Sequence, residues 1–328
     1  NHATRIEEPA SASYRGHVIY KCGVWTQGPA LLEALQLLEG FDLKGMTHNS
    51  PEAVHVTVEA LKLALADRDT HYADPLFNEI PLQGLLDPSY AAARRALIDL
   101  KHASRERRPG DPRQGAPLLP PARDPAAGHA PPRVAASRDT TTCLVADSQG
   151  NVVAATPSGW SGVLAGDTGV WLGSRLQSFN LWPNHPNVLE PTKRPRITLS
   201  PTLVLKDGKP ALAISVAGGD NQDQMTLQLV LNQLDFGLEP AVSVTAPRFM
   251  SDHFIGSFQQ KPPALGRLRI NPEIGAGTLS ALRDRGHDLA EHASSPLSAA
   301  PIVIRIDPAS GLLQAAGDPR AARHALAY

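Results

Sequence analysis

The chain is poor in several features that would identify common classes of protein. It has only two cysteines among 328 residues, Cys22 and Cys143, which is too few for a disulfide framework or a cysteine-rich metal site. Its formal net charge is −1, so charge alone gives no reason to expect nucleic acid or a membrane surface as a partner. No apolar run approaches the roughly 20 residues that cross a membrane. We therefore expect no nucleic-acid partner and no membrane span in this chain.

The chain begins at Asn1, without an initiator methionine or a signal-peptide pattern. We therefore expect that a leader or a larger N-terminal part precedes this sequence. Two cysteines suit any compartment, so the location stays open. The hydrophobic share of 42%, by contrast, is enough for a sizeable core, in one large domain or two ordinary ones.

The first hundred residues have the pattern of helices. Leucines at helical spacing predict a helix over residues 30–39, and Gly40 is a suitable stop. Ser50 and Pro51 combine an N-cap with a first-turn proline, so a second helix is expected to start there. A third helix is predicted over residues 90–100. We expect residues 1–104 to be mostly helical.

Residues 105–132 differ sharply in composition, with many prolines, glycines and arginines and almost nothing apolar. Such a segment cannot offset its ordering entropy by burial. The sequence therefore predicts a flexible linker over residues 105–139. An ordinary interdomain linker and a tether that swings away after the chain is cut both remain open, and only the position beside Thr140 favours the tether.

From Thr140 onward the pattern changes to strands and short turns. The turn Lys206-Asp207-Gly208-Lys209 predicts a hairpin. Helices are predicted after Asp220, up to Gly237, and over residues 276–285. These elements describe an α+β protein, and we expect a four-layer αββα sandwich. The predicted strands cover residues 140–146, 151–156, 168–172, 201–205, 211–216, 301–306 and 312–315.

The strongest chemical feature is a threonine at the start of a predicted strand, directly after the linker. A threonine hydroxyl needs a base, and a chain-terminal threonine supplies one in its α-amino group, whose usual pKa is about 7.7–8.0. This requires the Asp139–Thr140 bond to be cut, and the Thr140 hydroxyl could itself attack the Asp139 carbonyl. Taken alone, a threonine-rich run is more often a plain β-strand.

A second feature is Gly218-Gly219, between a predicted strand and a predicted helix. Their backbone N–H groups could point at a developing oxyanion, with no side chains in the way. Asp220 is a natural N-cap for the helix, whose positive end lies at the same turn. A tight turn is the simpler explanation of a lone Gly-Gly, and only the position relative to Thr140 favours the oxyanion interpretation.

A set of short segments, in the same order along nearly the whole chain, resembles the γ-glutamyltranspeptidases, which are N-terminal-nucleophile hydrolases. The resemblance implies that residues 1–104 are the C-terminal part of a large subunit and residues 140–328 the small, catalytic subunit. It also implies that the front of the large subunit, with an arginine that holds the substrate carboxylate, is absent here. The segments are Leu38-Glu39-Gly40-Phe41-Asp42, Ala66-Asp67-Arg68, Asp74-Pro75, Thr140-Thr141, Asp147, Gly150-Asn151, Val153, Lys193-Arg194-Pro195, Leu199-Ser200-Pro201-Thr202, Gly218-Gly219, Asp235-Phe236-Gly237-Leu238, Ala246-Pro247-Arg248-Phe249 and Asp318-Pro319-Arg320.

By this resemblance Thr140 is the nucleophile and Asp139–Thr140 the self-cleavage bond. Gly218 and Gly219 are the oxyanion donors. Ser158 stands where the family has a threonine that hydrogen-bonds the nucleophile. From the sequence alone, a turn residue after Pro157 explains Ser158 equally well.

The chain departs from the family where the family grips a γ-glutamyl group. It has Trp160, Arg175 and Ser178 in place of an asparagine, a glutamine and an aspartate, and Ile197-Thr198 in place of two serines. Without the aspartate, a buried ammonium would be unpaired, whereas an arginine suits a carboxylate. We therefore expect a donor other than ordinary γ-glutamyl, such as a dicarboxylic or N-blocked acyl group. The expected substrate-binding residues are Trp160, Arg175, Ser178, Thr198 and Asp220.

The sequence thus predicts an amide hydrolase or acyl transferase that cuts itself into residues 1–139 and 140–328, which stay together as a heterodimer. The acyl group would come from glutathione or another small amide or peptide and form an ester with Thr140. Water or an amine would then take the acyl group from this ester. A cephalosporin-acylase-like enzyme and an uncut, inactive scaffold remain alternatives. No cofactor is expected, and no metal, because no histidine clusters with cysteines or carboxylates along the sequence. The resemblance is compatible with a periplasmic or secreted protein.

Overall fold

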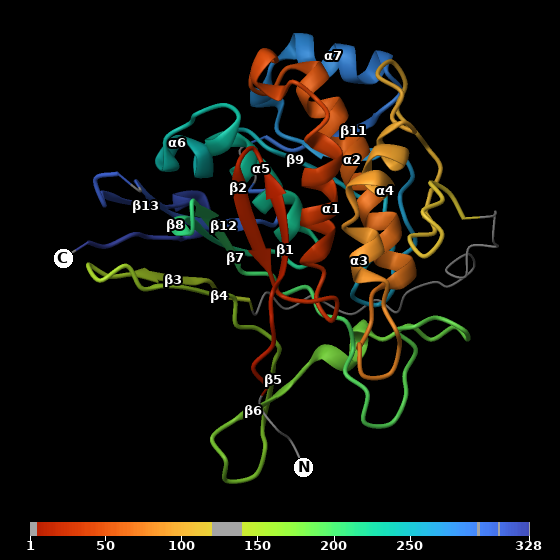
Figure 1. The fold of residues 1–328 in the computed structure, drawn as a ribbon, viewed down its shortest axis with the longest axis vertical. Coiled ribbons are helices and arrows are strands. Elements are labelled where there is room, and N and C mark those ends of the chain that lie inside the picture. The colour runs from red at the N-terminus through yellow and green to blue at the C-terminus, as the bar shows by residue number, and fades with distance from the viewer. Residues whose placement is uncertain (1–4, 120–139, 294–295, 308, 328) are drawn as a thin grey trace.

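A six-stranded antiparallel sheet forms the centre of the fold (Figure 1). The structure, a computed structural model, describes residues 5–119, 140–293, 296–307 and 309–327. Residues far apart in the chain share this sheet, because β2 pairs with β7 and β12 pairs with β8. In sheet order the strands are β1 (Ala10–Tyr14), β2 (His17–Lys21), β7 (Thr202–Lys206), β8 (Lys209–Ala217), β12 (Ala300–Ile306) and β13 (Leu313–Gly317).

The hairpin of β1 and β2 corrects the expectation that residues 1–104 are mostly helical. A two-residue turn joins the strands, with φ of 49° at Arg15 and 73° at Gly16, the backbone that suits a tight hairpin. β1 consists mainly of small residues, which have little strand preference of their own. Its place depends on β2, which pairs with β7 almost two hundred residues later, and no local pattern reports that contact.

Helices cover one face of this sheet (Figure 1). α1 (Pro29–Leu38) and α5 (Asn221–Leu234) pack on it, and α2 (Pro51–His71) packs behind α1 and is buried along most of its length. The predicted helix start at Ser50 is confirmed, because its hydroxyl accepts a hydrogen bond from Ala53 N at 3.2 Å. The third predicted helix is shorter than expected, since α4 ends at Arg95.

Smaller elements complete the helical side. The predicted helix over residues 276–285 is confirmed as α7, which packs with a three-stranded sheet against α2. The remaining elements on this side are α3 (Leu82–Leu85), α4 (Pro88–Arg95), α6 (Pro240–Thr245), α7 (Ala276–Asp284), β9 (Phe249–Ser251), β10 (Arg267–Ile270), β11 (Asp288–Glu291), and the 3-10 turns η1 (Leu43–Gly45), η3 (Pro272–Ile274) and η4 (Pro319–Ala321).

The opposite face of the central sheet carries the hairpin of β3 (Cys143–Ala146) and β4 (Val152–Ala155), which contacts β8 and β12. The strand predicted from Thr140 therefore begins three residues later. A second hairpin, β5 (Trp160–Leu164) with β6 (Trp171–Gly173), extends away from the sheet at the bottom of Figure 1. The sequence missed β5. The α+β class is confirmed, and the four-layer sandwich stays a prediction, because the described residues supply only two strands on this face.

The flexible linker predicted from Arg105 is wrong for residues 105–119, which pack against α2. Arg108 Nη2 lies 3.1 Å from Glu59 Oε2, and Gly110 N donates to Asp67 Oδ1 at 2.7 Å. Composition misled here because the segment is anchored by ion pairs and backbone hydrogen bonds to acidic residues of α2, not by apolar burial. Residues 120–139 lie outside the described part of the chain.

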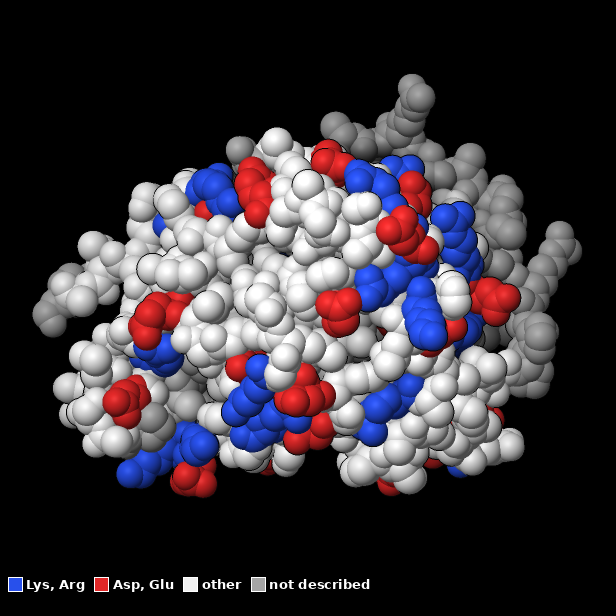
Figure 2. Space-filling view, turned by 90° about the horizontal axis from the view of Figure 1, so that it is seen from above, with Lys and Arg blue, Asp and Glu red and all other residues white. Residues whose placement is uncertain are grey.

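Charges of both signs alternate on the end of the molecule that carries α7 (Figure 2). Ion pairs account for part of this mixture, including Arg283 with Glu291 and Arg267 with Asp288. None of the helices in the described ranges is long and apolar enough to cross a lipid bilayer.

Candidate active site

Thr140 and Ser158 face each other across the two ends of the β3–β4 hairpin. Their hydroxyl oxygens are 2.7 Å apart, and Thr141 N donates to Pro157 O at 3.0 Å. These two contacts hold the chain before β3 against the chain after β4. Thr140 is half-buried. Asp139 lies outside the described residues, so the predicted cleavage bond has no structural description.

Arg175 extends this arrangement from the far side of Ser158. Its Nη2 donates a hydrogen bond to Ser158 Oγ, and its guanidinium carbon lies 5.2 Å from the centre of the Phe258 ring. Gly159 makes room for it: φ there is +96°, and a Cβ would come within 3.3 Å of Arg175 Nε. Arg175 begins the 3-10 turn η2 (Arg175–Ser178). The guanidinium thus sits two hydrogen bonds from the Thr140 hydroxyl.

Gly218 and Gly219 form the sharp turn between β8 and α5. Their φ angles are +151° and +59°, which only glycine adopts easily. A Cβ on Gly219 would come within 3.1 Å of Phe258 Cε2, so the ring that stacks on Arg175 also borders this turn. Thr156, directly after β4, shares a 2.7 Å hydroxyl contact with Ser215 of β8. The hairpin that carries the two candidate hydroxyls therefore lies beside the strand that leads into the glycine turn.

Asp220 does not cap α5, contrary to the sequence-based expectation. It is already helical in backbone conformation, whereas an N-cap with a side-chain hydrogen bond needs an extended one. Its carboxylate instead accepts from Arg68 Nη1 at 2.8 Å and from Ser257 N at 2.9 Å. Asp220 therefore ties the start of α5 to α2.

A buried cluster of charges lies behind the glycine turn. Arg68 is fully buried and its Nη2 lies 2.7 Å from Asp69 Oδ1. Arg196, only 5% exposed, donates from Nη2 to Ser257 Oγ at 3.0 Å, and its Nη1 lies 3.7 Å from Asp69 Oδ1. Burial lowers the pKa of Arg196 to about 10. Sequence analysis missed Arg196, although its position between Pro195 and the departing pair Ile197-Thr198 was a signal.

Ser178 and Arg196 line the same small polar cavity, of about 10 Å³. Ser178 Oγ and Arg196 Nη1 are buried, and neither makes a hydrogen bond within the described residues. Thr198 lies beside the glycine turn, because Gln27 Nε2 donates both to Thr198 O at 3.1 Å and to Gly219 O at 3.0 Å. The other cavity residues are Asp69, Asn180, Ile255, Gly256, Ser257 and Gln260.

The structure thus gathers most of the predicted site residues and leaves one apart. Ser178, Thr198 and Asp220 are linked through the cavity and the glycine turn, and Arg175 reaches Thr140 through Ser158. Trp160, by contrast, lies on the β5–β6 hairpin, is 57% exposed, and packs edge-on against Trp171 at 5.4 Å between ring centres. The functional role of each of these residues stays a prediction.

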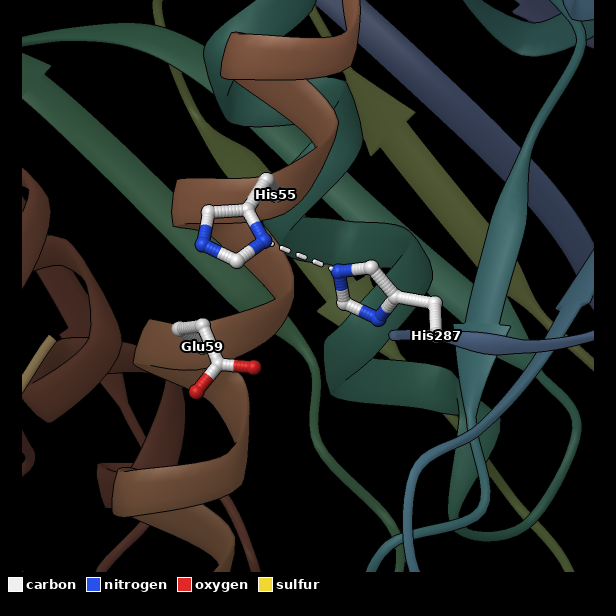
Figure 3. Close-up of side chains that lie close together, drawn as sticks. All are labelled: His55, Glu59 and His287. Carbon is white, nitrogen blue, oxygen red and sulfur yellow. Dashed lines mark hydrogen bonds between the residues drawn. The ribbon is translucent and has the colours of Figure 1, made fainter. Parts of the chain in front are cut away.

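Outside this site, two histidines and a glutamate lie together, which the sequence analysis did not expect (Figure 3). His55 Nδ1 is 2.9 Å from His287 Nε2, and Glu59 is one turn along α2 from His55. The Glu59 carboxylate already pairs with Lys62 Nζ at 2.6 Å and with Arg108 Nη2 at 3.1 Å. A divalent cation bound there would meet both of these positive groups, so the charges around the cluster do not favour a metal.

Because several histidines are buried, we expect acid to destabilise the fold. Burial lowers the pKa of His287 and His253 to about 3 and that of His185 to about 4. Below pH ~6.5 these histidines take up protons in the unfolded chain but stay neutral in the folded chain. The stability of the fold therefore falls as the pH drops below that value. The expected loss is about 1.4 kcal/mol per pH unit for each histidine.

Urea denaturation at pH 8, 6 and 5 measures this slope. His287→Gln is expected to flatten it, because one of the suppressed protonations is removed. His324→Gln is the matched control, because it removes an exposed histidine instead of a buried one, and His287→Gln should flatten the slope more than this control does. Equal slopes in wild type and His287→Gln would contradict the prediction.

Comparisons with known proteins agree on one family. A family described as gamma-glutamyltranspeptidase matches residues 1–328. The glutathione hydrolase-like YwrD proenzyme of Bacillus subtilis (strain 168) is 33% identical over 95% of this chain and 54% of its own length. The glutathione hydrolase proenzyme of Escherichia coli (strain K12) is 32% identical over 95% of this chain and 51% of its own.

A solved structure, the cephalosporin acylase from Bacillus halodurans, superimposes with a TM-score of 0.76 at 28% identity, over 95% of this chain and 51% of that one. The chain therefore spans about half the length of the relatives it matches.

Proposed function

The chain belongs to the gamma-glutamyltranspeptidase family, and from that premise we propose that it is part of a self-cleaving amide hydrolase or acyl transferase with Thr140 as its nucleophile. The observation that carries the proposal is the 2.7 Å contact between the Thr140 and Ser158 hydroxyls at the base of the β3–β4 hairpin. Relatives named glutathione hydrolase proenzymes support the general chemistry.

Maturation and catalysis use the same hydroxyl. Thr140 Oγ1 attacks the carbonyl carbon of Asp139, and the C–N bond to Thr140 breaks, which frees the Thr140 α-amino group and leaves an ester on Oγ1. Water then hydrolyses this ester, which releases the Asp139 carboxylate and restores the Thr140 hydroxyl. In turnover, that amine takes the hydroxyl proton while Thr140 Oγ1 bonds to the substrate's acyl carbon. The leaving amine departs with a proton, and water or a second amine then releases the acyl group from Thr140.

The glycine turn supplies the expected charge stabilisation. Backbone N–H groups of Gly218 and Gly219 would donate to the oxygen that becomes negative during each addition to the acyl carbon. Support for this role comes from the side-chain-free backbone of the turn and from Phe258, which borders both this turn and Arg175.

We infer that the acyl donor carries a carboxylate but no free ammonium. Arg196 can only donate hydrogen bonds, so it favours an anion at the cavity, and Ser178 contributes a hydroxyl but no negative charge. The acidic side chain there, Asp69, is already paired with Arg68 at 2.7 Å. A buried ammonium would therefore find no carboxylate of its own, which is strongly unfavourable. A donor without an ammonium also fits the acylase alternative, and the structural likeness to a cephalosporin acylase supports that alternative.

Glutaryl anilide and γ-glutamyl anilide test this choice, because they differ only by the ammonium group. We expect a higher kcat/KM for glutaryl anilide, by about 10-fold or more. Arg196→Met is expected to lower kcat/KM for glutaryl anilide by about 10–100-fold, the value of a charged hydrogen bond, and Arg196→Lys to lower it less. Efficient turnover of γ-glutamyl anilide or glutathione by wild type would reject the proposed donor.

A further inference from the structure

Asp220 directly follows the glycine turn and is connected to Arg196 through Ser257. The Asp220 carboxylate accepts from Ser257 Oγ at its Oδ1 and from Ser257 N at its Oδ2, the latter at 2.9 Å. The same Ser257 Oγ lies 3.0 Å from Arg196 Nη2. One buried serine hydroxyl therefore links the carboxylate beside the glycine turn to the arginine at the small polar cavity.

The chemistry of the three groups gives this link a single direction. A guanidinium donates hydrogen bonds and cannot accept them, so Ser257 Oγ accepts from Arg196. Asp220, which is paired with Arg68 at 2.8 Å, accepts hydrogen bonds and cannot donate them, so the one hydrogen of Ser257 points to Asp220. The hydroxyl cannot reverse, because either reversal would set two donors or two acceptors against each other. Arg196 Nη2 is thereby held, while its Nη1 makes no hydrogen bond within the described residues.

A second set of hydrogen bonds joins Asp220 to the glycine turn itself. Arg68 Nη1 donates both to Asp220 Oδ1 at 2.8 Å and to Gln27 Oε1 at 3.0 Å. Gln27 Nε2 in turn donates to Gly219 O at 3.0 Å. The Asp220 side chain is only 12% exposed and that of Arg68 is fully buried. The glycine turn and Arg196 are therefore both tied to one carboxylate.

We propose that Asp220 is a positioning residue that, acting through Ser257, fixes Arg196 relative to the glycine turn and so determines which acyl donors fit. This rests on the proposed function, in which the turn binds the acyl oxygen and Arg196 binds the carboxylate of the donor. The separation of those two sites must match the length of the donor, because both of its ends are bound at once. No proton is transferred along the link.

A positioning role and a purely structural role differ in their effect on selectivity. A link that only stabilised the fold would act in the same way on every donor. A link that positions Arg196 matters for a donor with a carboxylate, whereas a donor without one makes no use of Arg196. The ratio of kcat/KM between two such donors therefore separates the two roles.

Ser257→Ala removes the hydroxyl and leaves the ion pair of Asp220 with Arg68. For processed protein, we expect kcat/KM to fall by about 10-fold or more for glutaryl anilide and by less than about threefold for butyryl anilide, which lacks the carboxylate. Ser200→Ala is the matched control, because Ser200 is also buried and donates to a carboxylate of α5, that of Asp223, at 2.7 Å. This control should change both donors by the same factor.

A double-mutant cycle tests whether Ser257 acts through Arg196. In an Arg196→Met background, Ser257→Ala should change turnover of glutaryl anilide much less than it does in wild type. Equal effects in the two backgrounds, or an equal loss for the two anilides, would overturn the inference. If Ser257→Ala does not fold, Asp220→Asn takes its place in the same cycle. Asp220→Asn should lower kcat for both anilides through the turn and also reduce the preference for glutaryl anilide, and an unchanged preference would overturn the inference.

The proposed function fails on different results. A wild type that is uncut and inactive, or an Arg196→Met variant that turns over glutaryl anilide as well as wild type does, would reject the proposed function and with it the role of Asp220. If wild type is cut, active and dependent on Arg196, a Ser257→Ala variant with unchanged selectivity would reject the role of Asp220 alone.

Discussion

Thr140→Ala is expected to leave the chain uncut and to lower turnover by about 10⁴-fold or more, because one hydroxyl performs both steps. The variant keeps the fold, since Thr140 is half-buried at the edge of the β3–β4 hairpin and the neighbouring backbone hydrogen bond, from Thr141 N to Pro157 O, does not involve the Thr140 hydroxyl. Denaturing electrophoresis with N-terminal sequencing measures cleavage, and an acyl anilide measures turnover.

Two variants make this result specific. Thr141→Ala removes the neighbouring hydroxyl, which is exposed, and should be cut and active like wild type. Thr140→Ser keeps a nucleophilic hydroxyl and should retain part of both activities. Cleavage of Thr140→Ala at the same junction would contradict the proposal, and a wild-type protein that is active while uncut would do the same. An uncut, inactive wild type would favour the scaffold alternative.

Gly218→Ala has the second-largest expected effect. A Cβ there would lie 2.3 Å from the carbonyl oxygen of Ser298, a backbone atom that cannot turn aside as a side chain can. The turn must therefore move, which displaces the N–H groups of Gly218 and Gly219. We expect a loss of about 3 kcal/mol or more in the free energy of unfolding, and about 10²-fold or more in kcat.

Gly275→Ala is the matched control, since Gly275 also precedes a helix and has φ of +113°, but no atom lies within 4 Å of its added Cβ. It should lose only the cost of the strained backbone, about 1 kcal/mol, and keep kcat. Urea denaturation and kinetics on equal amounts of folded protein separate the two effects. A Gly218→Ala variant with the stability and kcat of Gly275→Ala would contradict the explanation.

Local chemistry allowed much of the fold to be predicted from the sequence. The Ser50 cap and the helix after it form as expected, and so does the hairpin turn, where φ is 49° at Asp207 and 76° at Gly208. Each depends on contacts between residues only a few positions apart. The same reasoning failed for residues 105–119, because composition reports apolar burial and these residues are held by ion pairs and hydrogen bonds.

For the candidate site, the sequence identified the residues better than their partners. It singled out Thr140, Ser158 and the glycine turn, and the structure puts the two hydroxyls in contact. It assigned Asp220 as a cap, whereas that carboxylate is taken by Arg68 and Ser257. Which of several donors reaches the Asp220 carboxylate depends on distances in the folded state, and spacing along the chain does not report them.

The sequence by itself determined where helices and tight turns begin, the α+β class, and the family resemblance carried by short segments. Only the tertiary structure decided the pairing of β2 with β7 and the hydrogen bonds of Arg175 with Ser158 and of Arg196 with Ser257. The same holds for the contact of His55 with His287, 232 residues away. The reason is that a cap or turn gains its energy within a few residues. Long-range contacts depend instead on packing summed over the whole core, which must first offset the entropy of bringing distant segments together.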